Sequence, residues 1–195
     1  GKLFLFVITM IRFSPLFVLM FAWVIVAQYV RVHDSNIEVD SGLTFERNIK
    51  KVPGSFVLKF DGNQCKSKDI HGDNNCHFNW GEDIIGYYNF SITTDINVGD
   101  KVEGHLKINR FIPYHFSCDL CGNDCVLEVP IVRIKFKIPM PPCPIHAHNE
   151  TQHLQYSLLP DSPTDGITAH LGGNIKVLKA SREELADVLI SIFLK

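Results

Sequence analysis

Apolar and cationic side chains alternate without interruption in the stretch Arg133-Ile134-Lys135-Phe136-Lys137-Ile138. Successive side chains of an extended strand point to opposite faces, so one face of this segment is apolar and the other is charged. The pattern is typical of an antiparallel strand that buries one face in a core and leaves the other face in water. It predicts a chain that is built from such strands.

The same period of two recurs after position 55. The apolar members of these runs are Phe56, Leu58 and Phe60; Tyr88, Phe90 and Ile92; Val102, Leu106 and Ile108; Leu154, Tyr156 and Leu158; Ile175 and Val177; and Val188, Ile190 and Ile192. Turn-forming sequences such as Asn97-Val98-Gly99-Asp100 separate the runs. Seven or more short strands joined by turns predict an all-β fold, an immunoglobulin-like β-sandwich of two antiparallel sheets. Residues 181–188 have local helical character, and we expect a turn there between the last two strands.

Composition limits the possible functions. Of the 195 residues, 46% are hydrophobic and 21% are charged, which is typical of a globular chain and excludes a disordered one. The balance of 19 Lys and Arg against 21 Asp and Glu gives a net charge of -2. Binding to duplex nucleic acid normally requires a basic excess, so we expect no nucleic-acid partner. Fourteen Phe against two Trp and three Met indicate bulky apolar lining.

The first thirty residues differ from the rest of the chain. Between positions 3 and 30 the only charged residue is Arg12, and an apolar stretch follows at 13–27. A basic residue, an apolar segment and a small residue at its end predict a secretory signal peptide over residues 1–27, with Met10 as a candidate natural start. The alternative is a membrane anchor, since about 20 apolar residues can span a bilayer, although Pro15 and Arg12 interrupt this one.

Two further regions follow the apolar segment. Residues 28–47 are polar and weakly patterned, and we expect them to form an N-terminal lead-in. Residues 48–195 carry the alternating runs and are predicted to form a single domain, with a first strand at 48–52.

The cysteines indicate an exported protein. Their number is even, and they are Cys65, Cys76, Cys118, Cys121, Cys125 and Cys143. In an oxidising compartment they predict a framework of three disulfides, in which a Cys65–Cys76 bond would close a polar surface loop. The Cys118-x-x-Cys121 spacing is also found in zinc sites, which are chiefly intracellular when built from thiolates. Two glycosylation sequons, at Asn89 and Asn149, agree with passage through the secretory route.

One region resembles a known family. The residues are Phe116-Ser-Cys118-Asp-Leu-Cys121, then Cys125, then Ile138-Pro-Met140-Pro-Pro-Cys143-Pro-Ile145. They resemble the MD-2-related lipid-recognition (ML) domain family, which includes ganglioside activator, lysosomal sterol-transfer and mite group 2 allergen proteins. The Cys-Pro-Ile triplet at Cys143, followed by a strand at 154–158, is the most specific mark. The resemblance spans about residues 48–195.

The resemblance implies a lipid cavity between the two sheets. Its candidate lining residues are Phe90, Ile92, Leu106, Ile108, Phe136, Ile138, Met140, Tyr156, Leu158 and Val177. It also implies disulfides Cys65–Cys76, Cys121–Cys143 and Cys118–Cys125. The chain departs from the family at the bridge between first and last strands, because Asp187 stands where Cys is expected and residues 42–48 contain no Cys.

The expected function is therefore that of a secreted or lysosomal lipid-binding or lipid-transfer protein without a cofactor. It would hold one sterol, fatty acid or glycolipid, and would meet a membrane surface or a receptor protein transiently. The alternative is an immunoglobulin-like adhesion or receptor-binding module with a solid core. No enzyme signature such as G-x-S-x-G or H-E-x-x-H is present, so we expect no catalysis.

Histidines gather after Cys143, at His146, His148 and His153. Exposed histidines of this kind are usually polar surface, although such a cluster can also bind a metal. In an acidic compartment their protonation would add positive charge near a membrane.

Overall fold

A computed structural model describes residues 41–128, 135–158, 160–161 and 168–195 of the chain. The predicted signal or anchor segment at 1–27, residues 28–40 of the lead-in, and Arg133 and Ile134 of the alternating stretch lie outside these ranges. The described residues form strands, turns and loops. No helix within them is long and apolar enough to cross a membrane.

Twelve strands make up this part of the chain. They are β1 (Gly42–Lys51), β2 (Gly54–Phe60), β3 (Cys65–Asp69), β4 (Gly72–Asn79), β5 (Asp83–Ile92), β6 (Lys101–Ile108), β7 (Ile112–Asp119), β8 (Cys125–Glu128), β9 (Lys135–Ile138), β10 (His148–Ser157), β11 (Ala169–Leu178) and β12 (Glu184–Leu194).

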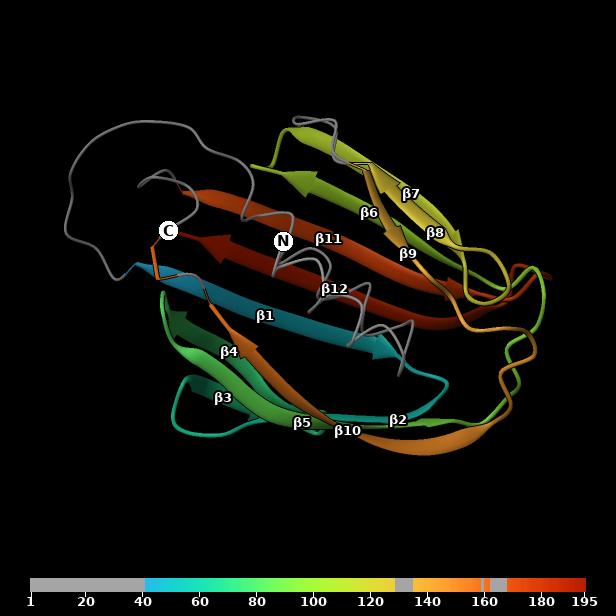
Figure 1. The fold of residues 1–195 in the computed structure, drawn as a ribbon, viewed down its shortest axis with the longest axis horizontal. Coiled ribbons are helices and arrows are strands. Elements are labelled where there is room, and N and C mark those ends of the chain that lie inside the picture. Colours follow the sequence, from blue (N-terminus) through green and yellow to red (C-terminus); the bar gives the residue numbers. More distant parts are fainter. Residues whose placement is uncertain (1–40, 129–134, 159, 162–167) are drawn as a thin grey trace.

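The strands form a two-layer, sandwich-like arrangement. Strands β1, β12, β11, β6 and β7 make one layer, and β2, β3, β4, β5 and β10 make the other (Figure 1). The predicted all-β sandwich is thus confirmed, with one difference. The layers are not separate sheets, because β1 pairs with β4 and the hydrogen-bonded order β10-β5-β2-β4-β1-β12-β11-β6-β7 is continuous. The β2–β4 pairing is parallel, and β8 and β9 form a second, two-stranded sheet.

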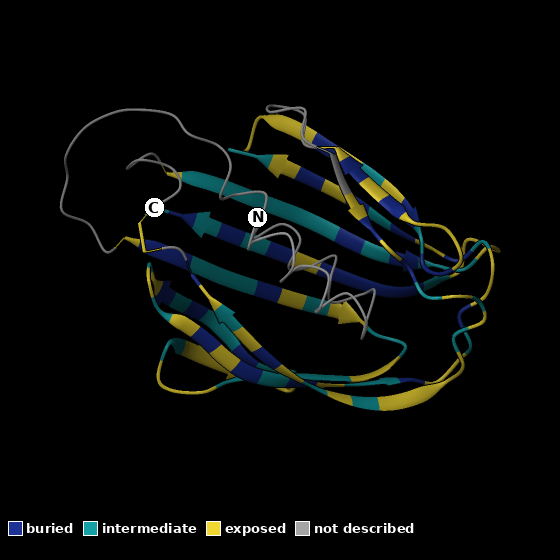
Figure 2. Ribbon diagram, viewed as in Figure 1, coloured by how far each residue is buried: buried dark blue, intermediate teal, exposed yellow. Residues whose placement is uncertain are grey.

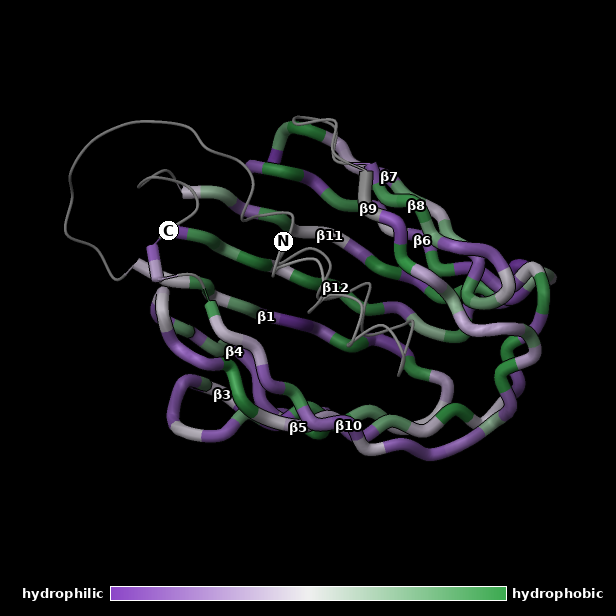
Figure 3. The backbone as a smooth tube through the Cα atoms, in the orientation of Figure 1, coloured by the Kyte–Doolittle hydropathy of each residue, from purple (hydrophilic) through white to green (hydrophobic). Residues whose placement is uncertain are grey.

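The core lies on the inward faces of the strands. Along β6 buried and exposed positions alternate, as the period of two predicts (Figure 2). Apolar residues also run along β12 in the middle of its layer (Figure 3). Val102, Leu106 and Ile190 are among the side chains that are almost completely buried. Because β12 pairs with β1 on one side and β11 on the other, it is an interior strand of its layer with no free edge.

Where the alternation is clean, the predicted strands are present. The runs at 56–60, 88–92, 102–108, 154–158, 175–177 and 188–192 correspond to β2, β5, β6, β10, β11 and β12. The predicted turn between the last two strands is also present, because β11 ends at Leu178 and β12 begins at Glu184. Residues 135–138 of the opening stretch form β9.

Two local predictions were wrong. The first strand begins at Gly42, not at Asn48, so residues 42–47 of the expected lead-in belong to the sheet. A charged residue, Arg47, occupies an inward position of β1 and hides the alternation of Leu43, Phe45 and Ile49. The segment between Cys65 and Cys76 is also not a loop. It forms the β3–β4 hairpin, whose β3 strand is mostly exposed and therefore lacks an apolar face.

The three disulfides join Cys65 to Cys76, Cys118 to Cys125 and Cys121 to Cys143. This is the pairing that the family resemblance implies, and it is confirmed. The first bond crosses the β3–β4 hairpin directly, because Cys65 and Cys76 are register partners. The other two bonds hold the turn after β7 and the connection after β9, next to the buried Leu120.

Replacing both Cys121 and Cys143 with Ser is expected to lower the free energy of unfolding by about 3 kcal/mol, from the loop entropy that the bond removes from the unfolded chain. The bond closes a separation of 22 residues. Urea denaturation of the oxidised protein measures the loss. The matched control is the double Ser variant of Cys65 and Cys76, whose separation of 11 residues predicts a smaller loss. A larger loss in the control would contradict this ranking.

A ladder of backbone pairs joins β1 to β12, where the family would have a disulfide. It runs from Leu43 opposite Leu194 to Lys51 opposite Asp187. The buried carboxylate of Asp187 accepts a hydrogen bond from Asn174 Nδ2 at 2.9 Å. It also lies 3.5 Å from Lys50 Nζ. Backbone pairing and this polar network therefore hold the two strands together without a covalent bond.

Candidate functional site

The candidate site is the apolar interior between the two layers. The predicted lining residues Ile92, Leu106, Ile138, Met140, Leu158 and Val177 are buried in one core cluster. Phe90, Ile108 and Tyr156 also pack against this cluster, but they remain partly accessible. Phe136 is in β9, and its side chain lies outside the described part of the structure. Nine of the ten predicted residues therefore lie in or against one core cluster, and three of the nine are partly exposed.

Two half-buried aromatic residues of the interior, Phe45 and Phe60, were missed from the sequence, whereas their neighbour Phe90 was predicted. Phe45, Phe60 and Phe90 each pack against the main core and also against a second cluster of Leu58, Tyr88 and Leu154. The rings of Phe90 and Tyr88 stack with centroids 5.9 Å apart. Phe60 was already part of an alternating run, whereas Phe45 lies in the segment that was expected to be a lead-in. Choosing every inward aromatic of the runs would have found Phe60.

A glycine makes room for another interior aromatic ring. Gly104 on β6 is the register partner of Phe116 on β7. A Cβ atom at position 104 would lie 2.0 Å from Cε1 of Phe116, so the ring occupies the space that any other residue would fill. Phe116 is half-buried against the core. The Phe116 ring thus fills the interior space above Gly104, where a side chain at position 104 would otherwise lie.

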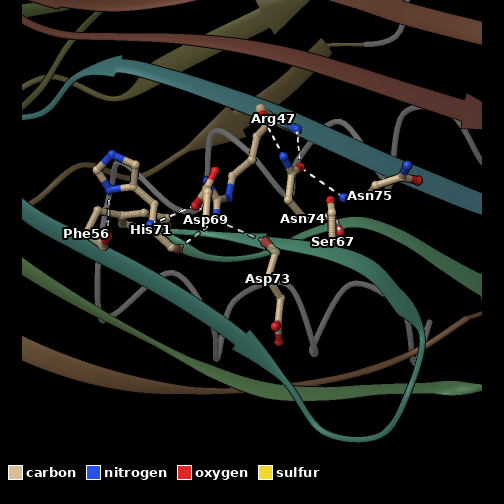
Figure 4. Close-up of polar contacts among 8 residues, drawn as sticks. All are labelled: Arg47, Phe56, Ser67, Asp69, His71, Asp73, Asn74 and Asn75. Carbon is tan, nitrogen blue, oxygen red and sulfur yellow. Dashed lines mark hydrogen bonds and ion pairs between the residues drawn. The ribbon is translucent and has the colours of Figure 1, made fainter.

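A buried arginine ties β1 to the β3–β4 hairpin (Figure 4). The Arg47 side chain is 1% exposed, and its Nη1 and Nη2 donate to the two carboxylate oxygens of Asp69 at 3.1 and 3.2 Å. Nη2 also donates to the carbonyl oxygens of His71 at 2.6 Å and Asp73 at 3.0 Å. Burial tends to raise the pKa of Asp69, but the hydrogen bonds from Arg47 and from the His71 backbone outweigh it and lower the pKa.

Two surface hollows lie outside the apolar interior. One, of about 320 Å³, is lined by Ser55, Asn89, Phe90, Ser91, Asn149, Glu150 and Thr151. The other, of about 170 Å³, lies beside the start of β6 and the turn after β11. Polar residues line most of both hollows, so neither corresponds to the predicted cavity between the layers.

The histidines that follow Cys143 do not converge. His146 Nδ1 lies 3.1 Å from a carboxylate oxygen of Asp95, whose other oxygen accepts the Ala147 backbone N–H at 2.8 Å. These two contacts lower the pKa of Asp95, the backbone hydrogen bond more than the histidine. His153 contacts the ring of Tyr87 instead. Among the described residues, no group of three or more His, Cys, Asp or Glu is placed to hold a metal ion.

His170 is the histidine whose environment lowers its pKa. Its ring stacks on Phe193 at 4.3 Å, and its Nε2 lies 3.0 Å from Ser191 Oγ. Its backbone exchanges hydrogen bonds with Asn109, which precedes Arg110 in the β6–β7 turn. Burial is the larger cause of the lowered pKa, and the positive charge of Arg110 adds to it.

The lowered pKa of His170 predicts a loss of stability in acid. Above the ordinary value of 6.5 the imidazole is neutral in both states and contributes no pH dependence. Below 6.5 the unfolded chain takes up the proton first, so stability falls until pH reaches the folded-state pKa. The free energy of unfolding, measured from pH 7.5 to 5, should fall less steeply in His170→Gln. His153→Gln is the control and should keep the wild-type slope; equal slopes in all three proteins would contradict the prediction.

Comparisons with known proteins yield distant structural similarity and no sequence match. No family model and no curated protein sequence matches this chain. Among solved structures, the chain is similar to chicken MD-1 in its complex with lipid IVa. The TM-score is 0.37 at 11% sequence identity, and the similarity covers 83% of this chain and 96% of MD-1. A similarity this distant establishes neither a family nor a ligand. Membership of the lipid-recognition family therefore stays a prediction.

Proposed function

We propose that this protein binds one lipid between its two layers and carries or presents it without covalent chemistry. The observation that supports this most is the set of half-buried apolar side chains on the inward faces. Phe45 and Ile108 come from one layer, and Phe60, Phe90 and Tyr156 from the other. Each ligand CH₂ that these side chains bury contributes about 0.8 kcal/mol, so one acyl chain or sterol can bind without a polar contact.

The chemistry of the interior favours an extended hydrophobic ligand with at most a small polar group. The half-buried side chains that pack against the core include several aromatic and aliphatic ones, and Tyr156 adds a hydroxyl. A sterol, a fatty acid or the acyl part of a glycolipid meets this requirement. The three disulfides are compatible with the predicted secreted or lysosomal location, where a membrane or a receptor protein would accept the ligand.

A second function is favoured by the fully buried residues. Val102, Leu106, Leu127 and Ile190 form a closed part of the core, and neither surface hollow enters it. A sandwich that is packed in this way throughout would serve as an adhesion or receptor-binding module. Such a module would use its outer surface instead of its interior.

Mass spectrometry under native conditions separates the two functions. The full chain is produced in a eukaryotic secretory host, purified, and measured both intact and after organic extraction. A lipid carrier should show a mass increment that extraction removes, together with a lipid in the extract. A fluorescent fatty acid should then bind the extracted protein at a ratio of one per chain. Absence of both the lipid and the probe binding would overturn the proposal and favour the adhesion module.

A further inference from the structure

The two glycosylation sequons lie side by side on neighbouring strands. Asn89-Phe90-Ser91 is in β5, and Asn149-Glu150-Thr151 is in β10. The strands are antiparallel, with Asn89 opposite Thr151 and Ser91 opposite Asn149. Each acceptor asparagine therefore faces the hydroxyl residue of the other sequon. Nothing in the sequence separation of 60 residues required this alignment.

Both acceptors occupy the outer face of their layer. Because side chains alternate along a strand, Asn89, Ser91, Asn149 and Thr151 share one face, while Phe90 packs against the interior core. Asn89, Asn149 and Thr151 are exposed. The same residues, with Ser55 of β2, line the hollow of about 320 Å³. The face is thus polar and open, as attachment of a sugar to an asparagine amide requires.

Strand β10 is also the free edge of the large sheet. In the described part of the chain it pairs with β5 on one side and with no strand on the other. An unprotected edge of this length can pair with another chain, and proteins block such edges with charge, proline or a covering group. The ten residues of β10 contain no proline and no Lys or Arg. Its one carboxylate, Glu150, is half-buried and lies 3.4 Å from His148 Nε2, so the edge strand carries no exposed carboxylate either.

We propose that Asn89 and Asn149 both carry N-linked glycans, and that the glycan on Asn149 shields the free edge of β10. The two glycans would share one patch over β2, β5 and β10. They would leave the opposite layer, β1, β12, β11, β6 and β7, uncovered. The proposal depends on export of the chain but not on lipid binding.

Enzymatic deglycosylation tests the modification. The full chain and four variants are secreted from a eukaryotic host, and intact masses are compared before and after treatment with peptide N-glycosidase. The wild type should lose two glycans. Asn89→Gln and Ser91→Ala should both lose only the glycan on Asn149, and Asn149→Gln and Thr151→Ala only the glycan on Asn89. A secreted wild-type chain that carries fewer than two glycans would overturn the proposal.

The role at the edge has its own test, by size-exclusion chromatography with light scattering. Thr151→Ala and Thr151→Lys both remove the sequon of Asn149, but only the lysine places a charge on the edge strand. Thr151→Ala should shift from monomer to larger species, whereas Thr151→Lys and Asn89→Gln should stay monomeric. A monomeric Thr151→Ala, or equal association of the two Thr151 variants, would overturn the shielding role.

Discussion

Arg47→Met is expected to lower the free energy of unfolding by about 3–5 kcal/mol, the usual cost of removing one partner from a buried, hydrogen-bonded ion pair. The substitution keeps an unbranched apolar stem but removes four hydrogen bonds that converge on the β3–β4 hairpin. The carbonyl oxygens of His71 and Asp73 each lose a donor, and the Asp69 carboxylate loses the guanidinium that neutralises it. Urea denaturation at pH 7 measures the effect.

Lys50→Met on the same strand is the matched control. Lys50 is 52% exposed and lies 3.5 Å from Asp187, so its loss should cost less than about 1 kcal/mol, as is usual for a surface ion pair. The double variant Arg47→Met with Asp69→Asn should lose less than the sum of the single losses, because both changes act on one network. If Arg47→Met and Lys50→Met cost the same, Arg47 does not anchor the hairpin.

Leu106→Ala and Phe90→Ala should separate stability from lipid binding. Leu106 is 1% exposed in the closed core, and its truncation should cost about 2–5 kcal/mol of stability by leaving a cavity. Phe90 is half-buried and faces the proposed ligand. Its truncation should weaken fatty-acid affinity about tenfold, since loss of roughly two CH₂ equivalents of contact costs about 1.5 kcal/mol.

Urea denaturation and a displacement titration with a fluorescent fatty acid measure the two effects. Leu189→Ala is the control, because Leu189 is an apolar residue that is 38% exposed on the outer face of β12. Leu189→Ala should change neither the free energy of unfolding nor the affinity for the fatty acid. Wild-type affinity in Phe90→Ala would place the ligand elsewhere and contradict the proposed site.

Whether a strand could be predicted from the sequence depends on what its faces contact. β6 and β12 were predicted because one face of each packs in the core, which leaves apolar residues at every second position. β3 was missed because it is the outer strand of a hairpin with exposed residues on both faces. The first half of β1 was missed because Arg47 breaks its pattern, and its burial is possible only with the hairpin beside it.

The residues of the candidate site also include some properties that the sequence predicts and others that it does not. The runs in the sequence identified Phe90, Ile108 and Tyr156 as inward residues, and the structure places all three against the core. The alternating runs could not distinguish these three residues from the fully buried Leu106, since alternation indicates which face is apolar and not how tightly that face is packed. The disulfide pairing was implied by the family resemblance around Cys143 and is confirmed.

By itself, the sequence determined that this chain is all-β, which faces of its strands are apolar, and that its cysteines pair. The tertiary structure alone decided that β1 joins the two layers, that a buried arginine holds the hairpin, and that the two sequons face each other. The physical reason for this difference is the distance along the chain over which each feature is determined. A period of two is a local consequence of strand geometry and burial, whereas partners such as β5 and β10 are chosen by the packing of the whole chain.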